Sequence, residues 1–113
     1  MLPDDRIRVQ HILEAIADAR SFIAGHPRSE LGTNRMRLFA LVRCVEIVGE
    51  AAGRISETTK RAAPDIPWTA IVGMRNRLIH AYFDVDADIV WKTVTDELPS
   101  LADALRALLA DEI

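Results

Sequence analysis

The stretch LFALVRCVEIVGEAAGRI, residues 38–55, decides the fold class because its apolar residues recur at intervals of three and four. Drawn as a helix, the stretch places one apolar set on a single face: Leu38, Leu41, Val45, Val48, Ala52 and Ile55. Thr33 and Asn34 offer a side-chain N-cap just upstream. We therefore predict a long helix that starts near Asn34, reaches roughly Lys60 and buries this face in a core.

Helical signals of the same kind run along the rest of the chain. We expect further helices over residues 4–23, 67–81 and 86–98, with Pro99–Ser100 starting or kinking a last one. Asp86 can cap the helix that follows a turn at residues 82–86. The sequence shows no strand-like alternation and no internal repeat. It predicts an all-α protein, a compact up-and-down bundle of four to five helices.

The composition limits the class of protein. The chain has 113 residues, of which 50% are hydrophobic and only 5% aromatic, and its formal net charge is −3. A chain of this length can bury a real core, so we expect residues 1–113 to form one domain. No apolar run approaches the roughly 20 residues that span a bilayer, and the acidic start carries no signal-type stretch. We expect a cytoplasmic protein that does not enter a membrane.

Cysteine usage excludes two further classes. The single cysteine, Cys44, cannot form an internal disulfide, and no Cys or His lies near it at the spacing of a zinc site. We therefore expect Cys44 to be a small core residue, and we expect neither a metal ion nor another cofactor.

Charge is unevenly distributed along the chain. Residues 84–113 hold eight acids against two bases, a balance of −6, whereas residues 28–61 hold seven bases against four acids, a balance of +3. The middle of the chain is therefore the better face for a polyanion, and a solvated helix surface is the alternative explanation.

The side of the 38–55 helix opposite its core face is mixed. It carries charged and apolar residues together: Arg43, Glu46, Glu50 and Arg54 with Met36, Phe39 and Ile47. A helix with apolar residues on both sides is commonly sandwiched, so we interpret this side as a partner interface. A second copy of the chain would fill it most economically, and a partly exposed bundle helix is the alternative.

The segment GMRNRLIHAY, residues 73–82, departs most from ordinary packing. On a helical wheel its region has one apolar face, formed by Trp68, Ile71, Leu78 and Ile79. Arg75 falls in the middle of that face. A buried guanidinium is costly to desolvate unless a carboxylate meets it, and Glu46 and Glu50 are the natural candidates for this partner.

Asn76 and His80 are four residues apart on the flank of the same expected helix, and Gly73 removes bulk in front of them. This spacing predicts a shallow notch lined by imidazole, amide and guanidinium. An imidazole can take a proton from a ribose 2′-hydroxyl, while Arg75 stabilises charge on phosphorus. The pattern indicates metal-free RNA cleavage, for which a two-fold dimer would supply a second imidazole. The alternative is a structural histidine at a helix end beside a buried Arg–Glu pair.

The remaining candidates favour structural roles. His11 and His26 have no neighbour at metal-ligand spacing, so we expect both on the surface. Trp68 and Trp91 are most simply core or interface anchors. The sequence contains no Gly-rich phosphate loop, no nucleophile elbow and no paired-carboxylate metal motif.

The segment RNRLIHAY, residues 75–82, resembles the Arg-x4-His-x-Tyr motif of the HepT-like toxins, a branch of the all-α HEPN superfamily. Other parts of the chain resemble the same family in the same order: residues 11–16, Arg43 with residues 46–51, residues 66–68, Val90–Trp91 and Leu98–Pro99. The likeness covers nearly the whole chain, and the extended set of matches is far more specific than Arg-x4-His alone.

The resemblance implies a homodimeric ribonuclease whose two motifs line one cleft. His80 would be the acid-base residue, Arg75 would bind the phosphate, and Asn76 would assist as the polar residue after the arginine. Arg43, Glu46 and Glu50 would support them. One departure concerns Phe39, since the family often has an acid four residues before the arginine that Arg43 matches. Holding the active-site arginine would then fall to Glu46 or Glu50.

The resemblance also implies a partner. HepT-like toxins are usually encoded beside an antitoxin that resembles a minimal nucleotidyltransferase of the MntA type, which transfers AMP to the motif tyrosine; Tyr82 is the matching position. This implies the toxin of a type VII toxin–antitoxin pair, silenced when AMP obstructs RNA binding. The rival reading is a non-catalytic module that binds a nucleotide or presents itself as substrate to the nucleotidyltransferase, because Arg and His beside a notch serve binding as well as cleavage.

Overall fold

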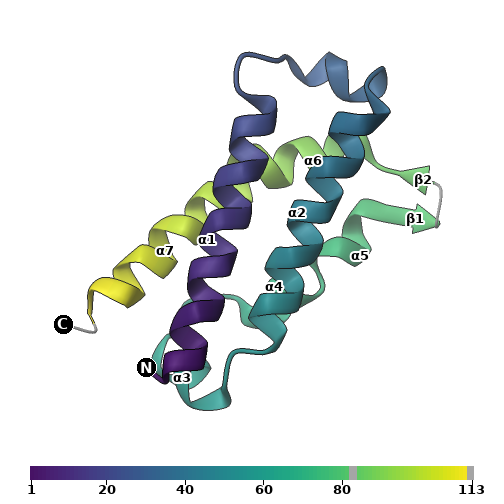
Figure 1. Cartoon of the computed structure of the whole chain (residues 1–113). Helices are drawn as coiled ribbons and strands as arrows, with labels where there is room; N and C mark the ends of the chain where they lie inside the picture. Colours follow the sequence, from purple (N-terminus) through teal and green to yellow (C-terminus); the bar gives the residue numbers. More distant parts are fainter. Residues whose placement is uncertain (82–83, 112–113) are drawn as a thin grey trace.

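Two long antiparallel helices form the frame of the molecule (Figure 1). The computed structural model of the chain describes residues 1–81 and 84–111, with only the backbone of His80 and Ala81. Helix α1 (Pro3–Ile23) has a proline in its first turn, a position where the missing amide hydrogen costs nothing. Helix α2 (Arg35–Gly53) returns alongside it and buries the apolar face predicted from the sequence.

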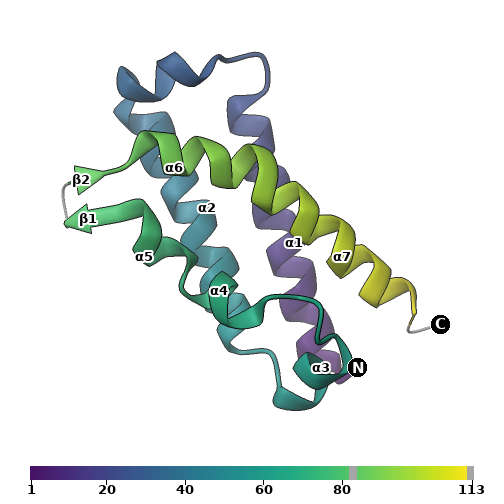
Figure 2. The same ribbon diagram turned by 180° about the vertical axis from the view of Figure 1, so that it is seen from behind.

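A second layer crosses this pair on one side (Figure 2). Helices α4 (Trp68–Val72) and α5 (Met74–Leu78) pack against α2. Helices α6 (Ala87–Lys92) and α7 (Leu98–Ala110) form one continuous rod, and α7 packs against α1. The all-α prediction is confirmed by this arrangement.

Helix α2 begins where the sequence predicts and ends earlier. The side chain of Asn34 caps it by accepting a hydrogen bond from the backbone N–H of Arg37 at 2.9 Å. The prediction that the helix reaches Lys60 is wrong, because α2 stops at Gly53 and a separate helix, α3 (Glu57–Ala62), follows. The break occurs because the hydroxyl of Ser56 accepts a hydrogen bond from the backbone N–H of Thr59 and so acts as the N-cap of a new helix, α3.

A buried carboxylate ties the start of α1 to the start of α3. Asp5 is 1% exposed and accepts the Ser56 N–H at 2.9 Å, the Ser56 hydroxyl at 2.5 Å and the Thr59 hydroxyl at 2.6 Å. Burial alone would raise the pKa of Asp5, but these three hydrogen bonds, helped by the charge of Arg8, hold it below its usual value. The charged form of Asp5 is therefore the form that stabilises the fold.

The region predicted as one helix over residues 67–81 is three elements. Helices α4 and α5 meet at Gly73, whose ψ of 0° breaks the helical hydrogen-bond ladder. Helix α5 ends at Leu78, and β1 (Ile79–Ala81) then pairs antiparallel with β2 (Asp84–Val85). The sequence predicted no strands, and this prediction is wrong for the short hairpin. Backbone pairing between β1 and β2 and a hydrogen bond from the Asp86 N–H to the Leu78 carbonyl hold the hairpin together.

Pro99 lies in the first turn of α7 (Leu98–Ala110), which confirms the prediction that the last helix starts there, although the helical backbone continues into it from the preceding turn. Asp86 caps α6 as predicted, because its side chain accepts the Ile89 N–H at 3.1 Å. A π-helical turn at Thr93–Glu97 joins α6 to α7. This wider turn relieves the clash between the proline ring and the carbonyl four residues earlier, so the rod continues through the proline.

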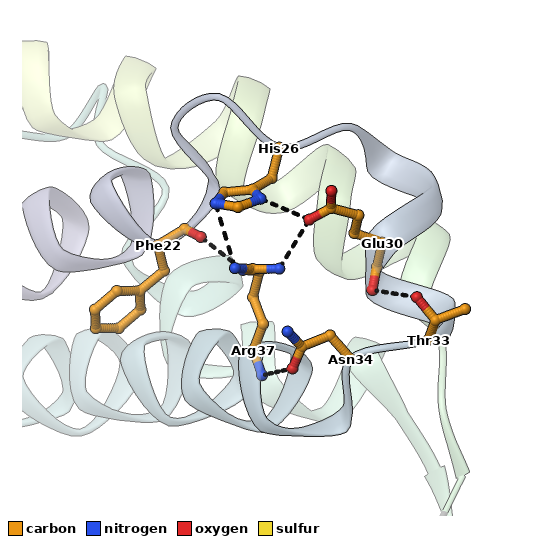
Figure 3. A network of polar contacts seen from close by, with 6 residues as sticks. All are labelled: Phe22, His26, Glu30, Thr33, Asn34 and Arg37. Atoms are coloured by element: carbon orange, nitrogen blue, oxygen red, sulfur yellow. Dashed lines mark hydrogen bonds and ion pairs between the residues drawn. The ribbon is translucent and has the colours of Figure 1, made fainter.

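Polar contacts close the connection between α1 and α2 (Figure 3). A 3-10 helix, η1 (Arg28–Gly32), carries Glu30, whose carboxylate meets His26 Nδ1 at 2.6 Å and Arg37 at 2.9 Å. The Arg37 guanidinium also donates to the Phe22 carbonyl and lies 3.3 Å from His26 Nε2. A neutral imidazole with its proton on Nδ1 satisfies both neighbours. His26, expected as a plain surface residue, is half-buried in this network.

One apolar core fills the space between the layers. Its largest fully buried side chains come from most elements of the fold: Val9, Ile12, Ile16, Leu31, Leu41, Val45, Val48, Leu78, Val90, Val94, Leu98 and Leu105. Cys44 is buried as predicted, and burial raises the pKa of its thiol to about 11, so the thiol stays protonated near neutral pH. Trp68 is buried as well. Within the described residues, no helix is long and apolar enough to cross a bilayer.

The Asp5→Ala substitution tests the anchor between α1 and α3. It removes three hydrogen bonds to a buried charge, so we expect a loss of about 2–3 kcal/mol in the free energy of unfolding. Because folding lowers the pKa of Asp5 below 3.8, the difference from wild type should be full above about pH 5 and shrink as the pH falls below 3.8. Urea titrations across this pH range measure it.

Asp4→Ala is the matched control, since Asp4 is the exposed neighbour of Asp5 in the same helical turn. We expect it to change the free energy of unfolding by less than about 0.5 kcal/mol. Equal effects of the two substitutions, or a wild-type advantage that does not depend on pH, would contradict this account of Asp5.

Candidate functional site

One of two glycines on the same side of α2, Gly49, lets α4 lie directly against it. A Cβ atom on Gly49 would lie 3.3 Å from the Val72 carbonyl oxygen and 3.4 Å from that of Ile71, both backbone atoms. A Cβ on Gly53, one turn later, would lie 3.8 Å from a methyl group of Val72, which is ordinary contact. A side chain at Gly49 would therefore be tight against the α4 backbone, so this contact sets how closely α4, and α5 after it, lie on α2.

A shallow hollow of about 260 Å³ opens beside this contact, and we call it the notch. Its lining comes from α2, the end of α4 and the start of α5: Glu46, Gly49, Glu50, Gly53, Val72, Arg75 and Asn76. The notch thus brings together four of the side chains that the sequence singled out, namely Arg75, Asn76, Glu46 and Glu50.

Arg75 is exposed in the notch, not buried in the core as the helical wheel predicted. Its side chain is 47% exposed, while Met74 is buried and occupies the core-facing position. The difference arises at Gly73, where the break in the helix shifts the following residues around the axis. A helical wheel drawn across residues 68–79 assumes an unbroken helix, and that assumption fails at Gly73.

Glu46 meets Arg75 as one of the two predicted partners. Its Oε2 lies 3.4 Å from Nε of Arg75, and its side chain is 28% exposed. This ion pair engages the inner nitrogen of the guanidinium. Among the side chains that the structure describes, none makes a hydrogen bond to the two terminal nitrogens of Arg75. The guanidinium is therefore oriented by a carboxylate while its fork of donors stays available to a ligand.

Glu50, the other predicted partner, pairs elsewhere. Its Oε1 lies 3.7 Å from Arg43 NH1, and both side chains are mostly exposed. Glu50 lines the notch, whereas Arg43 lies on the side of α2 that faces α1. The structure thus separates the supporting residues into Glu46 beside Arg75 and a second pair, Arg43 with Glu50, next to it.

The motif histidine lies on a strand. We expected Asn76 and His80 four residues apart on one helix, but α5 ends at Leu78 and the backbone of His80 belongs to β1. The backbone is extended from Ile79 to Ala81, which ends the helix and leads the chain into the hairpin. Asn76 remains exposed and lines the notch. Tyr82 lies outside the described residues.

The notch is open to solvent and holds charges of both signs. Arg75 and Asn76 offer hydrogen-bond donors to an anion, while the carboxylates of Glu46 and Glu50 pair with Arg75 and Arg43, respectively. The notch lacks the enclosed apolar walls that hold a small organic cofactor. Among the described residues, no three His, Cys, Asp or Glu side chains are grouped as metal ligands. An exposed, carboxylate-held arginine can bind one phosphate bidentately, which matches the phosphodiester of a nucleic acid.

Sequence reasoning missed the role of Gly49. The signal was present, because two glycines four residues apart fall on one side of a helix and remove side chains from a single stripe. Such a stripe indicates a close backbone approach.

The Gly49→Val substitution tests the contact that supports the notch. The added side chain must push the α4 backbone away, so we expect a loss of about 2 kcal/mol or more in the free energy of unfolding. Gly53→Val is the matched control, because only a movable Val72 side chain faces it, and we expect a change below about 0.5 kcal/mol. Thermal and urea unfolding measure both, and equal losses would contradict the assignment.

Comparison with known proteins agrees with the motif. The family model described as "Ribonuclease HepT-like" matches residues 12–108. A protein of Thermococcus cleftensis named "Probable ribonuclease HepT" is 42% identical over 100 residues, covering 85% of this chain and 91% of its own length. A candidate RNase of Methanocaldococcus jannaschii is 37% identical over 90 residues, covering 80% of this chain and 83% of its own.

A second candidate RNase of Methanocaldococcus jannaschii is 35% identical over 100 residues, covering 88% of this chain and 83% of its own length. No solved structure matches the chain. The family match covers α1 from Ile12 onward, all of α2 and the whole segment that forms the notch. This chain therefore belongs to the HepT-like ribonuclease family.

Proposed function

We propose that this protein is a metal-independent endoribonuclease that acts in the cytoplasm with Arg75 and His80 as its catalytic residues and Asn76 assisting. The observation that carries the proposal is the exposed Arg75 guanidinium, oriented by Glu46 in an open notch, five residues before His80 in a HepT-like chain. An arginine buried in the core could not reach a substrate, so this exposure matters.

The reaction follows from the chemistry of the two side chains. The imidazole of His80 removes the proton of a ribose 2′-hydroxyl, and the 2′-oxygen attacks the adjacent phosphorus. The bond from phosphorus to the 5′-oxygen of the next nucleotide breaks, and that oxygen takes up a proton. The products are a 2′,3′-cyclic phosphate and a 5′-hydroxyl end. Arg75 stabilises the negative charge on the phosphoryl oxygens in the transition state.

One imidazole cannot readily serve as base and acid in the same step, so the proposed active form is a two-fold dimer with two motifs in one cleft. The N-terminal end of α2 supports this proposal, because Met36 is 83% exposed and Phe39 is 45% exposed there. Exposed large apolar side chains of this kind favour burial against a partner.

Alanine substitutions at the two catalytic positions test the proposal. We expect His80→Ala and Arg75→Ala each to lower the rate of RNA cleavage in excess EDTA by at least about 100-fold. The measurement uses total cellular RNA and purified protein free of any antitoxin, with the oligomeric state of each variant compared with that of wild type.

Arg77→Ala is the matched control, since Arg77 is an equally exposed arginine of α5 that pairs with Glu97 outside the notch. It should cleave at close to the wild-type rate. Cleavage by His80→Ala equal to that of wild type would remove His80 from the catalytic assignment and would point to a contaminating nuclease.

We also propose that the protein is the toxin of a type VII toxin–antitoxin pair. Its partner would be a nucleotidyltransferase of the MntA type that transfers AMP from ATP to the hydroxyl of Tyr82, releasing pyrophosphate. Tyr82 follows the motif histidine by two residues, so an added phosphodiester and adenine would stand close to the RNA site. The added negative charge would compete with RNA for Arg75.

The Tyr82→Phe variant tests the modification, because it removes only the acceptor oxygen. Incubated with the cognate nucleotidyltransferase and ATP, wild type should gain the mass of one or more AMP units and lose cleavage activity. Tyr82→Phe should gain no mass and keep cleaving. Modification of the phenylalanine variant would show that AMP is attached elsewhere.

A non-catalytic role is the second candidate function. The same oriented guanidinium would hold the phosphate of a nucleotide, or the domain would serve only as a substrate for the nucleotidyltransferase. Wild-type protein that binds RNA or nucleotide without cleaving it, with binding lost in Arg75→Ala, would favour this role over the ribonuclease.

A further inference from the structure

A second hollow lies between α1 and α2, on the side of α2 that bears Arg43. We call it the α1–α2 groove, and its volume is about 460 Å³. Its basic residues come from both helices: Arg8 and His11 from α1, and Arg43 and Arg54 from α2 and its C-cap. Two acids, Asp4 and Glu50, also line it, so three guanidiniums face two carboxylates.

Two of these guanidiniums make no direct bond to the rest of the protein. Within the part of the chain that the structure describes, Arg8 and Arg54 make no hydrogen bond and no ion pair. The charge of Arg8 lowers the pKa of the buried Asp5 without a direct contact, because the hydrogen bonds of Asp5 come from Ser56 and Thr59. Cations that are held in a groove without a protein partner are available to an anionic ligand.

The groove also has apolar surface between its cations. Ile7 of α1 is 49% exposed and Ile47 of α2 is half-buried, and both line the groove. A ligand with phosphates at intervals and flat apolar groups between them fits such a surface better than an isolated inorganic anion does. A nucleic acid strand has this composition.

The groove adjoins the notch. Glu50 lines both hollows, and its ion pair with Arg43 lies on the boundary between them. A strand with one phosphate at Arg75 would therefore reach Arg43 and then the groove by crossing a single helix, α2. Glu50 on this path would repel a phosphate unless Arg43 neutralises it, and their 3.7 Å contact supplies that neutralisation.

We propose that the α1–α2 groove binds the phosphodiester backbone of the RNA strand beyond the bond that is cut, with Arg8 and Arg54 as its phosphate ligands. The inference rests on the proposed ribonuclease function, since it extends the substrate from the notch. These arginines would bind the RNA, while Arg75 and His80 would catalyse its cleavage.

Equilibrium binding of an uncleavable strand tests the proposal without requiring catalysis. The probe is a fluorescently labelled single-stranded RNA with 2′-O-methyl riboses, titrated by anisotropy at several salt concentrations. The double variant Arg8→Gln and Arg54→Gln should bind about tenfold more weakly than wild type. The slope of log affinity against log salt should fall by about 1.4, because two phosphate contacts are lost.

The double variant Arg20→Gln and Arg61→Gln is the matched control. It removes the same charge from two exposed arginines outside the groove. We expect it to bind the probe within about twofold of wild type, with an unchanged salt slope. Equal weakening by both double variants would mean general attraction of RNA to positive charge, and would overturn the proposal.

Other outcomes are equally decisive. Wild-type affinity in the groove variant, or no binding of the probe by wild type, would overturn the proposal. So would a change of oligomeric state caused by the groove variant, because a second copy of the chain would then occupy the groove. Cleavage is scored separately with ordinary RNA: failure of wild type to cut it would contradict the ribonuclease, while groove-dependent binding of the probe would still support the groove.

Discussion

The contact between Gly49 and the backbone carbonyls of Ile71 and Val72 is the constraint on which the notch depends. Helix α2 supplies Glu46 and Glu50, and the chain after α4 supplies Arg75 and Asn76, so the distance between these groups follows from how closely α4 approaches α2. A side chain at Gly49 would separate the two halves. The 3.4 Å contact between Glu46 and Arg75 is thus a consequence of a close packing contact one turn away.

The fold could be predicted from the sequence where residues determine the structure of the helix to which they belong. The apolar spacing of residues 38–55 identified the core face of α2, and Asn34 and Asp86 cap their helices through their own side chains. Prediction failed where one residue changes the path of the chain. A ψ of 0° at Gly73 exchanges the positions of Met74 and Arg75, and a helical wheel contains no information about such a break.

The site was predictable in its residue types and less so in its arrangement. An arginine among apolar residues calls for a carboxylate, and that argument identified Glu46 correctly. The same argument offered Glu50, which pairs with Arg43 because the two face the α1 side of α2. The α1–α2 groove could not be predicted, since Arg8 and Arg54 are 46 positions apart in the sequence and meet only through the pairing of two helices.

Cleavage of an RNA with a single 2′-deoxyribose at the mapped cut site tests the central claim most directly. The account predicts that wild type, in excess EDTA, cuts the all-ribose strand to give a 2′,3′-cyclic phosphate, and leaves the strand with the 2′-deoxyribose intact at that site. The reason is that the nucleophile removed is the one His80 activates. Equal cutting of both strands, or cutting that requires added Mg²⁺, would contradict a metal-independent mechanism built on Arg75 and His80.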